Sequence, residues 1–256
     1  MKKLKLFSFV VMALVALTGT VNANTDLLVA DDLVGVSFWV ISMGMLAATA
    51  FFFLERGSVA SNWRTTLTVA GIVTGVTFIN YLYVRNIYIG QGEALILYRY
   101  VDWIITMPLQ MIQFYLILAT VRKVPKSLFW KLLIGSIVVV LAAYLGSSEN
   151  IPSMVGYVIS IGGWIYILYE IFSGEAGRAV AKSGNKPMVS AYVSMRMIVT
   201  VGWAIYPLGY IFGYITNSLD NNLLNIIYNI ADFINKIAFG LVIWVAAMQN
   251  TAPRTR

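Results

Sequence analysis

The chain of 256 residues contains neither cysteine nor histidine. Without cysteine, disulfides, thiolate metal sites and thiol nucleophiles are excluded. Without histidine, the chain lacks the usual general base, the usual zinc ligand and the usual switch near neutral pH. Any chemistry must therefore be carried by carboxylates, lysine, arginine, hydroxyls and amides, and no metal site is expected.

Charge is also scarce, since charged residues make up 11% of the chain and hydrophobic residues 59%. Soluble domains contain about 25% charged and about 45–50% apolar residues. A soluble chain of this length would lack the charged side chains that cover a surface in water. The composition therefore predicts an integral membrane protein.

The N-terminus has the pattern of a cleaved export signal. A basic start and an apolar run of about twelve residues, ending near Leu17, precede a small-residue cleavage site at Ala23. A transmembrane anchor is the alternative, but a spanning helix needs about 20 apolar residues. We predict a signal peptide over residues 1–23 and one membrane domain over residues 24–256.

The rest of the chain divides into seven apolar runs separated by polar breaks. Each run is near or above the length that crosses a bilayer, and in lipid the backbone must satisfy its hydrogen bonds within a helix. The predicted fold is an all-α, seven-transmembrane-helix bundle. The expected helices cover residues 33–54, 63–84, 95–121, 128–145, 151–172, 188–215 and 223–248.

Lysine and arginine lie almost entirely on one side of this arrangement. The loops on the opposite side hold only Arg85. Because cytoplasmic loops are rich in these residues, we expect the N-terminus outside and the C-terminus in the cytoplasm, in a bacterial inner membrane. No basic patch is interleaved with aromatics, so a nucleic-acid partner is not expected. The cytoplasmic set is Arg56, Arg64, Arg122, Lys123, Lys126, Lys131, Arg178, Lys182, Lys186, Arg254 and Arg256.

Four ionisable residues lie deep inside the expected spans, where such residues are costly and by default functional. Arg99 and Asp102 are in the third span, and Asp232 and Lys236 share one face of the seventh because they are four residues apart. They could be an ion pair that fixes helix packing. Alternatively, Lys236 near the midplane is a desolvated amine that forms a Schiff base with an aldehyde cofactor.

Polar residues continue along the third span. Arg99, Asp102 and Thr106 project to one side, followed by Gln110 and Gln113. Gln113 is 11 residues from Asp102, which is roughly 16 Å along a helix axis and nearly the same face. Packing alone would use one or two such residues, so five indicate a path or a buried charge cluster.

Two further ionisable residues, Glu170 and Arg196, lie close to the cytoplasmic ends of their spans. Long side chains at such positions can reach the membrane interface. We therefore expect a structural rather than a functional role for both.

Three strings resemble the third, sixth and seventh helices of the microbial rhodopsins, specifically of the proteorhodopsin family: RYVDWIITMPLQ, GWAIYPLGY and NIIYNIADFINKIAFGLVIW. The resemblance covers nearly the whole chain after the predicted signal. It implies that Lys236 binds all-trans retinal covalently as a protonated Schiff base. It also implies that Asp102 is the counterion and proton acceptor, Asp232 the second counterion, and Arg99 the arginine on their extracellular side.

The same resemblance implies a retinal pocket, for which aromatic side chains would give a rigid, apolar slot. Tyr81 matches a tyrosine near the seventh-helix aspartate, and Gln110 falls on the position that tunes colour in proteorhodopsins. Glutamine there goes with blue absorption and leucine with green, so we expect a blue-absorbing pigment. The pocket residues are Trp103, Trp164, Trp203, Tyr206 and Pro207.

Two positions depart from the pattern of pumping proteorhodopsins. Gln113 replaces a glutamate that donates a proton from the cytoplasmic side, and glutamine has no proton to give. Asn80 stands where many members have a histidine, and it can hydrogen-bond Asp102 but cannot hold a charge. We therefore expect a slow cycle at neutral and alkaline pH, since Glu170 is too near the inner surface to be a good substitute donor.

The same motif disfavours sodium or chloride transport. In relatives that pump these ions, asparagine replaces the counterion aspartate, with glutamine at the donor position. Here Asp102 is retained, which disfavours an anion beside the Schiff base, and Thr106 offers no carboxylate for sodium. An acidic acceptor favours proton chemistry.

The resemblance implies a light-driven transporter or photoreceptor rather than an enzyme. Our first interpretation is an outward proton translocator in the lipid bilayer that absorbs blue light and cycles slowly. The alternative is a photosensor with a long-lived intermediate, which would signal to a transducer. A third is a retinal protein with a structural role only, or an engineered donor mutant. Relatives form pentamers or hexamers, so a homo-oligomer is expected.

Overall fold

The computed structural model describes residues 31–251, so the predicted signal peptide lies outside the described residues. Within this range the regular structure is helical, without strands. Seven helical spans are long and apolar enough to cross a membrane. The seven-helix prediction is therefore confirmed.

Several spans consist of more than one helical element. The first three are α2 (Leu33–Glu55), the 3₁₀ turn η1 with α3 (Ser61–Trp63, Arg64–Gln91), and the 3₁₀ turn η2 with α4 (Ile96–Arg99, Tyr100–Ala119). The next two are α5 (Lys126–Ser147) and α6 (Ser153–Phe172), with α7 (Glu175–Ala181) after α6. The sixth is α8 (Lys186–Met197), η3 (Ile198–Gly202), α9 (Ile205–Tyr210) and η4 (Ile211–Ile215). The seventh is α10 (Asn221–Asp232), η5 (Phe233–Ala238) and α11 (Phe239–Gln249).

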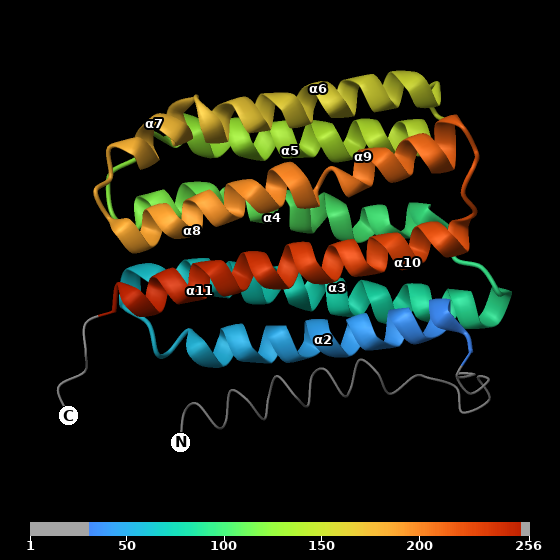
Figure 1. Ribbon diagram of the computed structural model, residues 1–256, viewed down its shortest axis with the longest axis horizontal. Coiled ribbons are helices and arrows are strands. Elements are labelled where there is room, and N and C mark those ends of the chain that lie inside the picture. The colour runs from blue at the N-terminus through green and yellow to red at the C-terminus, as the bar shows by residue number, and fades with distance from the viewer. Residues whose placement is uncertain (1–30, 252–256) are drawn as a thin grey trace.

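The spans run side by side along the long axis, and neighbours in sequence mostly pack against each other (Figure 1). α2 packs on α3, α4 lies between α3 and α5, and α5 packs on α6. The seventh span completes the bundle, because α10 packs on α2 and α11 packs on α8.

The surface of the bundle is apolar around its middle. Val101, Val158 and Val201 are each at least 60% exposed, and many other large apolar side chains are also exposed. Soluble proteins rarely expose apolar surface on this scale. Polar residues such as Thr74, Asn225 and Asn229 are instead fully buried, so the outer surface suits lipid and the interior holds the polar groups.

Local sequence signals set where several helices begin and end. The side chains of Asp32, Asn185 and Asp220 each accept a hydrogen bond from a backbone N–H three residues later, which caps the N-termini of α2, α8 and α10. Gly92 ends α3 with a φ of 73°, a conformation that glycine adopts without strain.

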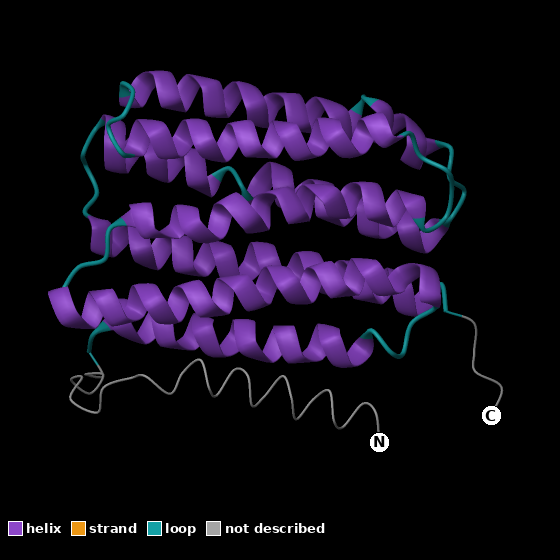
Figure 2. Ribbon diagram, turned by 180° about the vertical axis from the view of Figure 1, so that it is seen from behind, coloured by secondary structure: helices purple, strands orange, loops and turns teal. Residues whose placement is uncertain are grey.

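The sixth and seventh spans are interrupted near their middle. The elements η3, η4 and η5 are π-helical, and a short turn at Trp203 and Ala204 separates η3 from α9. This turn is the loop in the middle of a helix in Figure 2. Pro207 contributes to the break because it has no N–H to donate to a carbonyl in the preceding turn. π-Helical turns often occur at functional sites.

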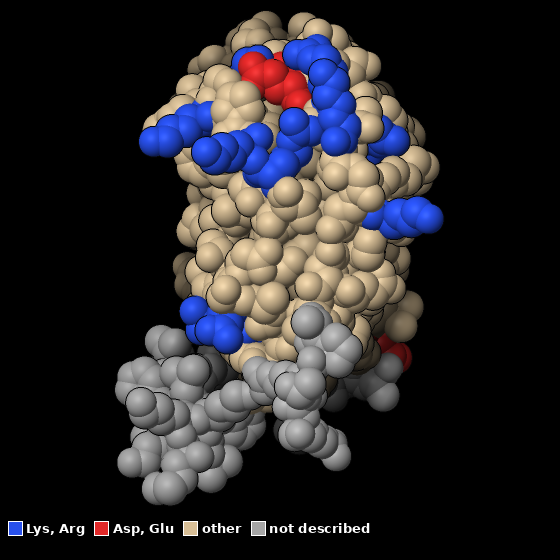
Figure 3. All heavy atoms as spheres, turned by 90° about the vertical axis from the view of Figure 1, so that its left-hand side faces the viewer, with Lys and Arg blue, Asp and Glu red and all other residues tan. Residues whose placement is uncertain are grey.

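Lysine and arginine side chains gather on the end of the bundle shown in Figure 3. The same end carries the loops after the first, third and fifth spans (Figure 1). Arg85 lies on α3, toward the opposite end, while Arg254 and Arg256 are outside the described residues. The side of the membrane that each end faces stays a prediction.

Candidate functional site: a buried charge cluster beside an aromatic cavity

Lys236 lies in η5 of the seventh span, and its side chain contacts the third span. Its side chain is 3% exposed, and its Nζ donates a hydrogen bond to the carboxylate of Asp102 on α4. The same Nζ is 3.3 Å from Oδ2 of Asp232, one turn earlier in the seventh span. A lone buried ammonium would be very costly. Two carboxylates beside it offset that cost, so the three groups form one charge cluster.

Asp102 is held from the second span as well. Its Oδ1 accepts a hydrogen bond of 2.9 Å from the hydroxyl of Thr77 on α3. Asn80, about one turn farther along α3, makes no hydrogen bond to Asp102, and its buried Nδ2 is without a partner among the described residues. Asn80 therefore does not make the hydrogen bond to Asp102 that its amide is capable of, and Thr77 contacts the carboxylate instead.

Asp232 is held by two phenol groups. The hydroxyl of Tyr81 donates to its Oδ2 at 2.8 Å, and that of Tyr206 donates to its Oδ1 at 2.6 Å. Hydrogen bonds to an ionised acceptor are short and strong. Both oxygens of the Asp232 carboxylate therefore accept a hydrogen bond from a phenol.

Arg99 approaches the cluster through Asp232, not through Asp102. Its Nη1 is 3.8 Å from Oδ2 of Asp232 and donates to the Tyr81 hydroxyl at 2.8 Å. The remaining nitrogens donate to side-chain oxygens of Asn225 and Asn229 on α10, at 2.8–3.0 Å for Asn225. Two cations and two carboxylates thus balance each other within the buried site.

Thr106 does not touch the carboxylates. It is fully buried, and its hydroxyl donates to the backbone carbonyl of Asp102 at 3.1 Å, which is the ordinary bond of a threonine within a helix. Thr106 therefore lies on the same face of α4 as Asp102, as the spacing predicts, but it is not part of the charge cluster.

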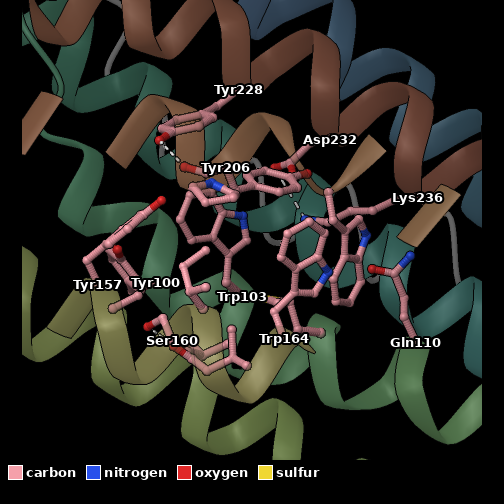
Figure 4. Close-up of a pocket in the computed structure, with 17 residues that line it drawn as sticks. Tyr100, Trp103, Gln110, Tyr157, Ser160, Trp164, Tyr206, Tyr228, Asp232 and Lys236 are labelled. Carbon is pink, nitrogen blue, oxygen red and sulfur yellow. Dashed lines mark hydrogen bonds and ion pairs between the residues drawn. The ribbon is translucent and has the colours of Figure 1, made fainter. Parts of the chain in front are cut away.

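An apolar cavity extends from Lys236 between the third to seventh spans. About 760 Å³ of space free of protein atoms lies between its lining residues, open solvent at its mouth included. In Figure 4, Lys236 and Gln110 lie on one side and Tyr100 and Tyr157 on the other. The lining comprises Tyr100, Trp103, Met107, Gln110, Val139, Val140, Ala143, Tyr157, Ser160, Ile161, Trp164, Trp203, Tyr206, Pro207, Tyr228, Asp232 and Lys236.

The walls of this cavity are rigid because aromatic rings pack on each other. The ring of Trp103 meets those of Tyr206 and Tyr228 edge-on, with centroids 5.3 and 5.5 Å apart. Trp164 donates from Nε1 to the carbonyl of Val199 at 3.2 Å, which fixes the indole against the sixth span. A flat, apolar molecule with one group near Lys236 suits these aromatic walls.

Comparison with known proteins identifies the family. The family model described as bacteriorhodopsin-like protein matches residues 32–250, nearly all of the described chain. The chain belongs to the bacteriorhodopsin-like family. The expected resemblance to microbial rhodopsins is thereby confirmed.

Among these rhodopsins, proteorhodopsins are strongly similar to the chain. It is 45% identical to the blue-light absorbing proteorhodopsin of Gamma-proteobacterium Hot 75m4, covering 93% of this chain and 95% of that one. It is 41% identical to the green-light absorbing proteorhodopsin of Gamma-proteobacterium EBAC31A08, covering 87% and 90%. The crystal structure of blue light-absorbing proteorhodopsin from Med12 matches with a TM-score of 0.74 and 47% identity, covering 85% and 99%.

The seven apolar spans and these bacterial relatives make the rhodopsin a multi-pass bacterial membrane protein. Within the described residues, no group of three or more acidic side chains is arranged to hold a metal ion. The polar groups of the site are carboxylates, amides, phenols, one lysine and one arginine.

Gln113 lies in an apolar part of the rhodopsin, about three turns along α4 from Asp102. Its side chain is buried, and its Nε2 donates to the backbone carbonyl of Thr66 at 3.2 Å. Its neighbours along α4, Phe114 and Ile117, belong to a large apolar cluster that fills this half of the bundle. The side chain of Gln113 is an amide and has no acidic proton to give.

Glu170 is a buried side chain near the end of α6. Its Oε2 accepts from the backbone N–H of Glu175 at 3.0 Å, and its Oε1 is 3.3 Å from Nζ of Lys131. It thus fixes the bend between α6 and α7, a structural role. Arg196 is also structural, since its guanidinium lies over the ring of Phe172, 4.2 Å from the centroid.

The uncharged residues that hydrogen-bond to the buried charged side chains were not predicted from the sequence. Thr77, Asn225 and Asn229 complete the hydrogen bonds of Asp102 and Arg99. For the two asparagines a signal existed, because positions 225, 229, 232 and 236 recur every three or four residues and so share one face of the seventh span. For Thr77 there was none, since threonine is common inside apolar helices.

Proposed function

We propose that this rhodopsin binds all-trans retinal covalently through Lys236, absorbs blue light and moves protons outward across the membrane. The observation that carries the proposal is the Lys236 ammonium, held between two carboxylates where an aromatic cavity begins. The similarity to a blue-light absorbing proteorhodopsin supports it.

The residues present fit retinal. The cavity is mostly apolar and is walled by aromatic rings, and Lys236 is the amine that lines it. When bound, retinal supplies the light-absorbing chain whose change of shape shifts the environment of the Lys236 nitrogen. Trp103, Trp164 and Trp203 would hold the polyene in place and exclude water from it.

Asp102 is the proposed acceptor of the proton on the Lys236 nitrogen. The two groups are already hydrogen-bonded, so the transfer needs no other carrier. Thr77 donates to the other carboxylate oxygen and so fixes its orientation. Asp232 keeps its charge because Tyr81 and Tyr206 donate to it, and it stabilises the cationic nitrogen without taking the proton.

We further propose that the nitrogen recovers its proton slowly. Among the described residues, those packed around Gln113 on the way from Lys236 to the end with the basic loops are apolar, and Gln113 itself is an amide rather than an acid. The proton must then come from water. The same observation favours a second candidate function, a photosensor in which the long-lived deprotonated state is the signal.

A measurement of external pH separates the two candidates. Cells that make the protein and receive retinal are illuminated with blue light, with and without a protonophore. We expect reversible acidification of the medium that the protonophore abolishes. A visible pigment that cycles under light without any net pH change would favour the sensor, and alkalinisation would refute outward transport.

Substituting Gln113→Glu is expected to speed up recovery after a flash by about 10- to 100-fold at pH 8. Proton transfer by a positioned side chain contributes about 10²–10⁴-fold in catalysis, and a carboxyl group among apolar neighbours stays neutral and able to donate. Flash photolysis across pH measures the rate. The outcome that refutes this role is a Gln113→Glu variant whose recovery keeps the rate and pH dependence of the wild type.

Substituting Gln110→Leu is expected to shift the absorption maximum toward green. Gln110 lines the cavity, and its amide stabilises the positive charge differently in the ground and excited states. Spectra of the two retinal-bound proteins measure the shift. Gln91→Leu, at an exposed position near the end of α3, is the control and should not change colour. A wild-type protein that already absorbs in the green would contradict the assignment.

A further inference from the structure

Asn235, next to the lysine in the chain, links the two interrupted spans. It lies in η5 and is 2% exposed. Its Nδ2 donates to the backbone carbonyl of Gly202 at 3.0 Å and to the hydroxyl of Tyr206 at 3.3 Å. Gly202 closes η3, and Tyr206 is in α9. One amide thus spans the break between the two halves of the sixth span.

Gly202 permits this contact because it has no side chain. A Cβ at this position would overlap with the Oδ1 of Asn235. The amide of Asn235 therefore lies directly against the backbone of η3. The two π-helical turns are joined at this point by a specific polar contact in addition to apolar packing.

The contact also determines where the Tyr206 proton points. Because Asn235 donates to the oxygen of Tyr206, the phenol is free to donate its own proton to Asp232, at 2.6 Å. The backbone carbonyl of Asn235 in turn accepts from Nε2 of Gln110 at 3.3 Å. Asn235 thus contacts the sixth span, the proposed colour-tuning residue on α4 and, through Tyr206, the second carboxylate.

We propose that Asn235 is a positioning residue that latches the turn carrying Lys236 to the interrupted sixth span and directs the Tyr206 hydroxyl at Asp232. π-Helical turns are frequent at functional sites, and residues at the ends of helical elements can absorb the backbone changes of a hinge. The latch stabilises the resting arrangement of that hinge, so its loss slows the return to rest. The light-driven part of this inference rests on the proposed function.

The test uses Asn235→Leu, which keeps a similar volume and removes the amide, and Gly202→Ala, which displaces the amide from the other side. Gly162→Ala on α6 is the matched control, since a Cβ there meets nothing within 4 Å. Flash photolysis of the retinal-bound proteins should show recovery slowed roughly fivefold in each variant and unchanged in the control. The double variant should be no more than about twofold slower than the slower single, because both changes break one contact.

An infrared measurement in the dark tests the positioning of Tyr206 directly. The carboxylate band of Asp232, assigned with Asp232→Asn, should shift in Asn235→Leu and in Gly202→Ala but not in Gly162→Ala. This comparison is made with and without retinal. An unshifted band, wild-type recovery in Asn235→Leu, or rates that multiply in the double variant would each overturn the latch.

The two proposals fail in different ways. A wild-type protein that forms no visible pigment with retinal refutes the proposed function, while the infrared comparison still decides the latch. A pigment that cycles identically with and without the Asn235 amide refutes the latch alone.

Discussion

Lys236→Ala is expected to abolish the visible absorption band completely, because no other buried amine lines the cavity within the described residues. Titrating the purified variant with retinal and recording its spectrum is the measurement. Lys182→Ala, at an exposed position after α7, should keep the full band. If Lys236→Ala kept the visible band, Lys236 could not be the residue that binds retinal.

Loss of folding must be separated from loss of attachment. Removing Lys236 leaves Asp102 and Asp232 without their shared cation, and breaking a buried ion pair costs about 3–5 kcal/mol. Lys236→Arg retains the charge but not the amine. It should fold with the helical content of the wild type, judged by circular dichroism, and remain colourless.

Asp102→Asn is expected to reduce light-driven acidification by at least about a hundredfold, the lower range for a group that transfers a proton. The variant should also absorb at longer wavelength, because the positive charge near Lys236 loses the anion that stabilises it most in the ground state. External pH under illumination and a dark spectrum measure both effects.

The control for this substitution is Asp31→Asn, which removes a carboxylate at an exposed position before α2. It should pump and absorb like the wild type. Acidification by Asp102→Asn at the wild-type rate would exclude Asp102 as the acceptor, and an unchanged spectrum would exclude it as the main counterion.

The sequence predicts the helices well because spanning a bilayer demands long apolar runs. The prediction is wrong where a charged residue was taken to mark the end of a helix. The second span was predicted to end at Val84, before Arg85, but α3 continues to Gln91. The guanidinium of Arg85 lies over the ring of Trp39, 5.2 Å from its centroid, so the helix accommodates the charge and ends only at Gly92.

The charged residues of the site were predictable, and their neutral partners were not. Lys236, Asp102, Asp232 and Arg99 stand out because charge is rare inside a membrane span. Which hydroxyl or amide meets each charge depends on how far each helix is rotated about its axis. Thr77, rather than Asn80, faces Asp102 for this reason, and periodicity alone does not fix that rotation.

The apolar cluster around Gln113 has an electrical consequence under the proposed function. Toward the opposite end, the site is continuous with hydrogen-bonding groups around Arg99, whereas the half with Phe114 and Ile117 is filled with hydrocarbon. A membrane voltage falls mainly across low-dielectric material, at about 2.3 kcal/mol per charge per 100 mV. The proton that returns to the Lys236 nitrogen crosses this apolar half in the proposed slowest step, and it moves against the membrane voltage there. A larger voltage should therefore slow the cycle, so that transport becomes slower as the membrane charges.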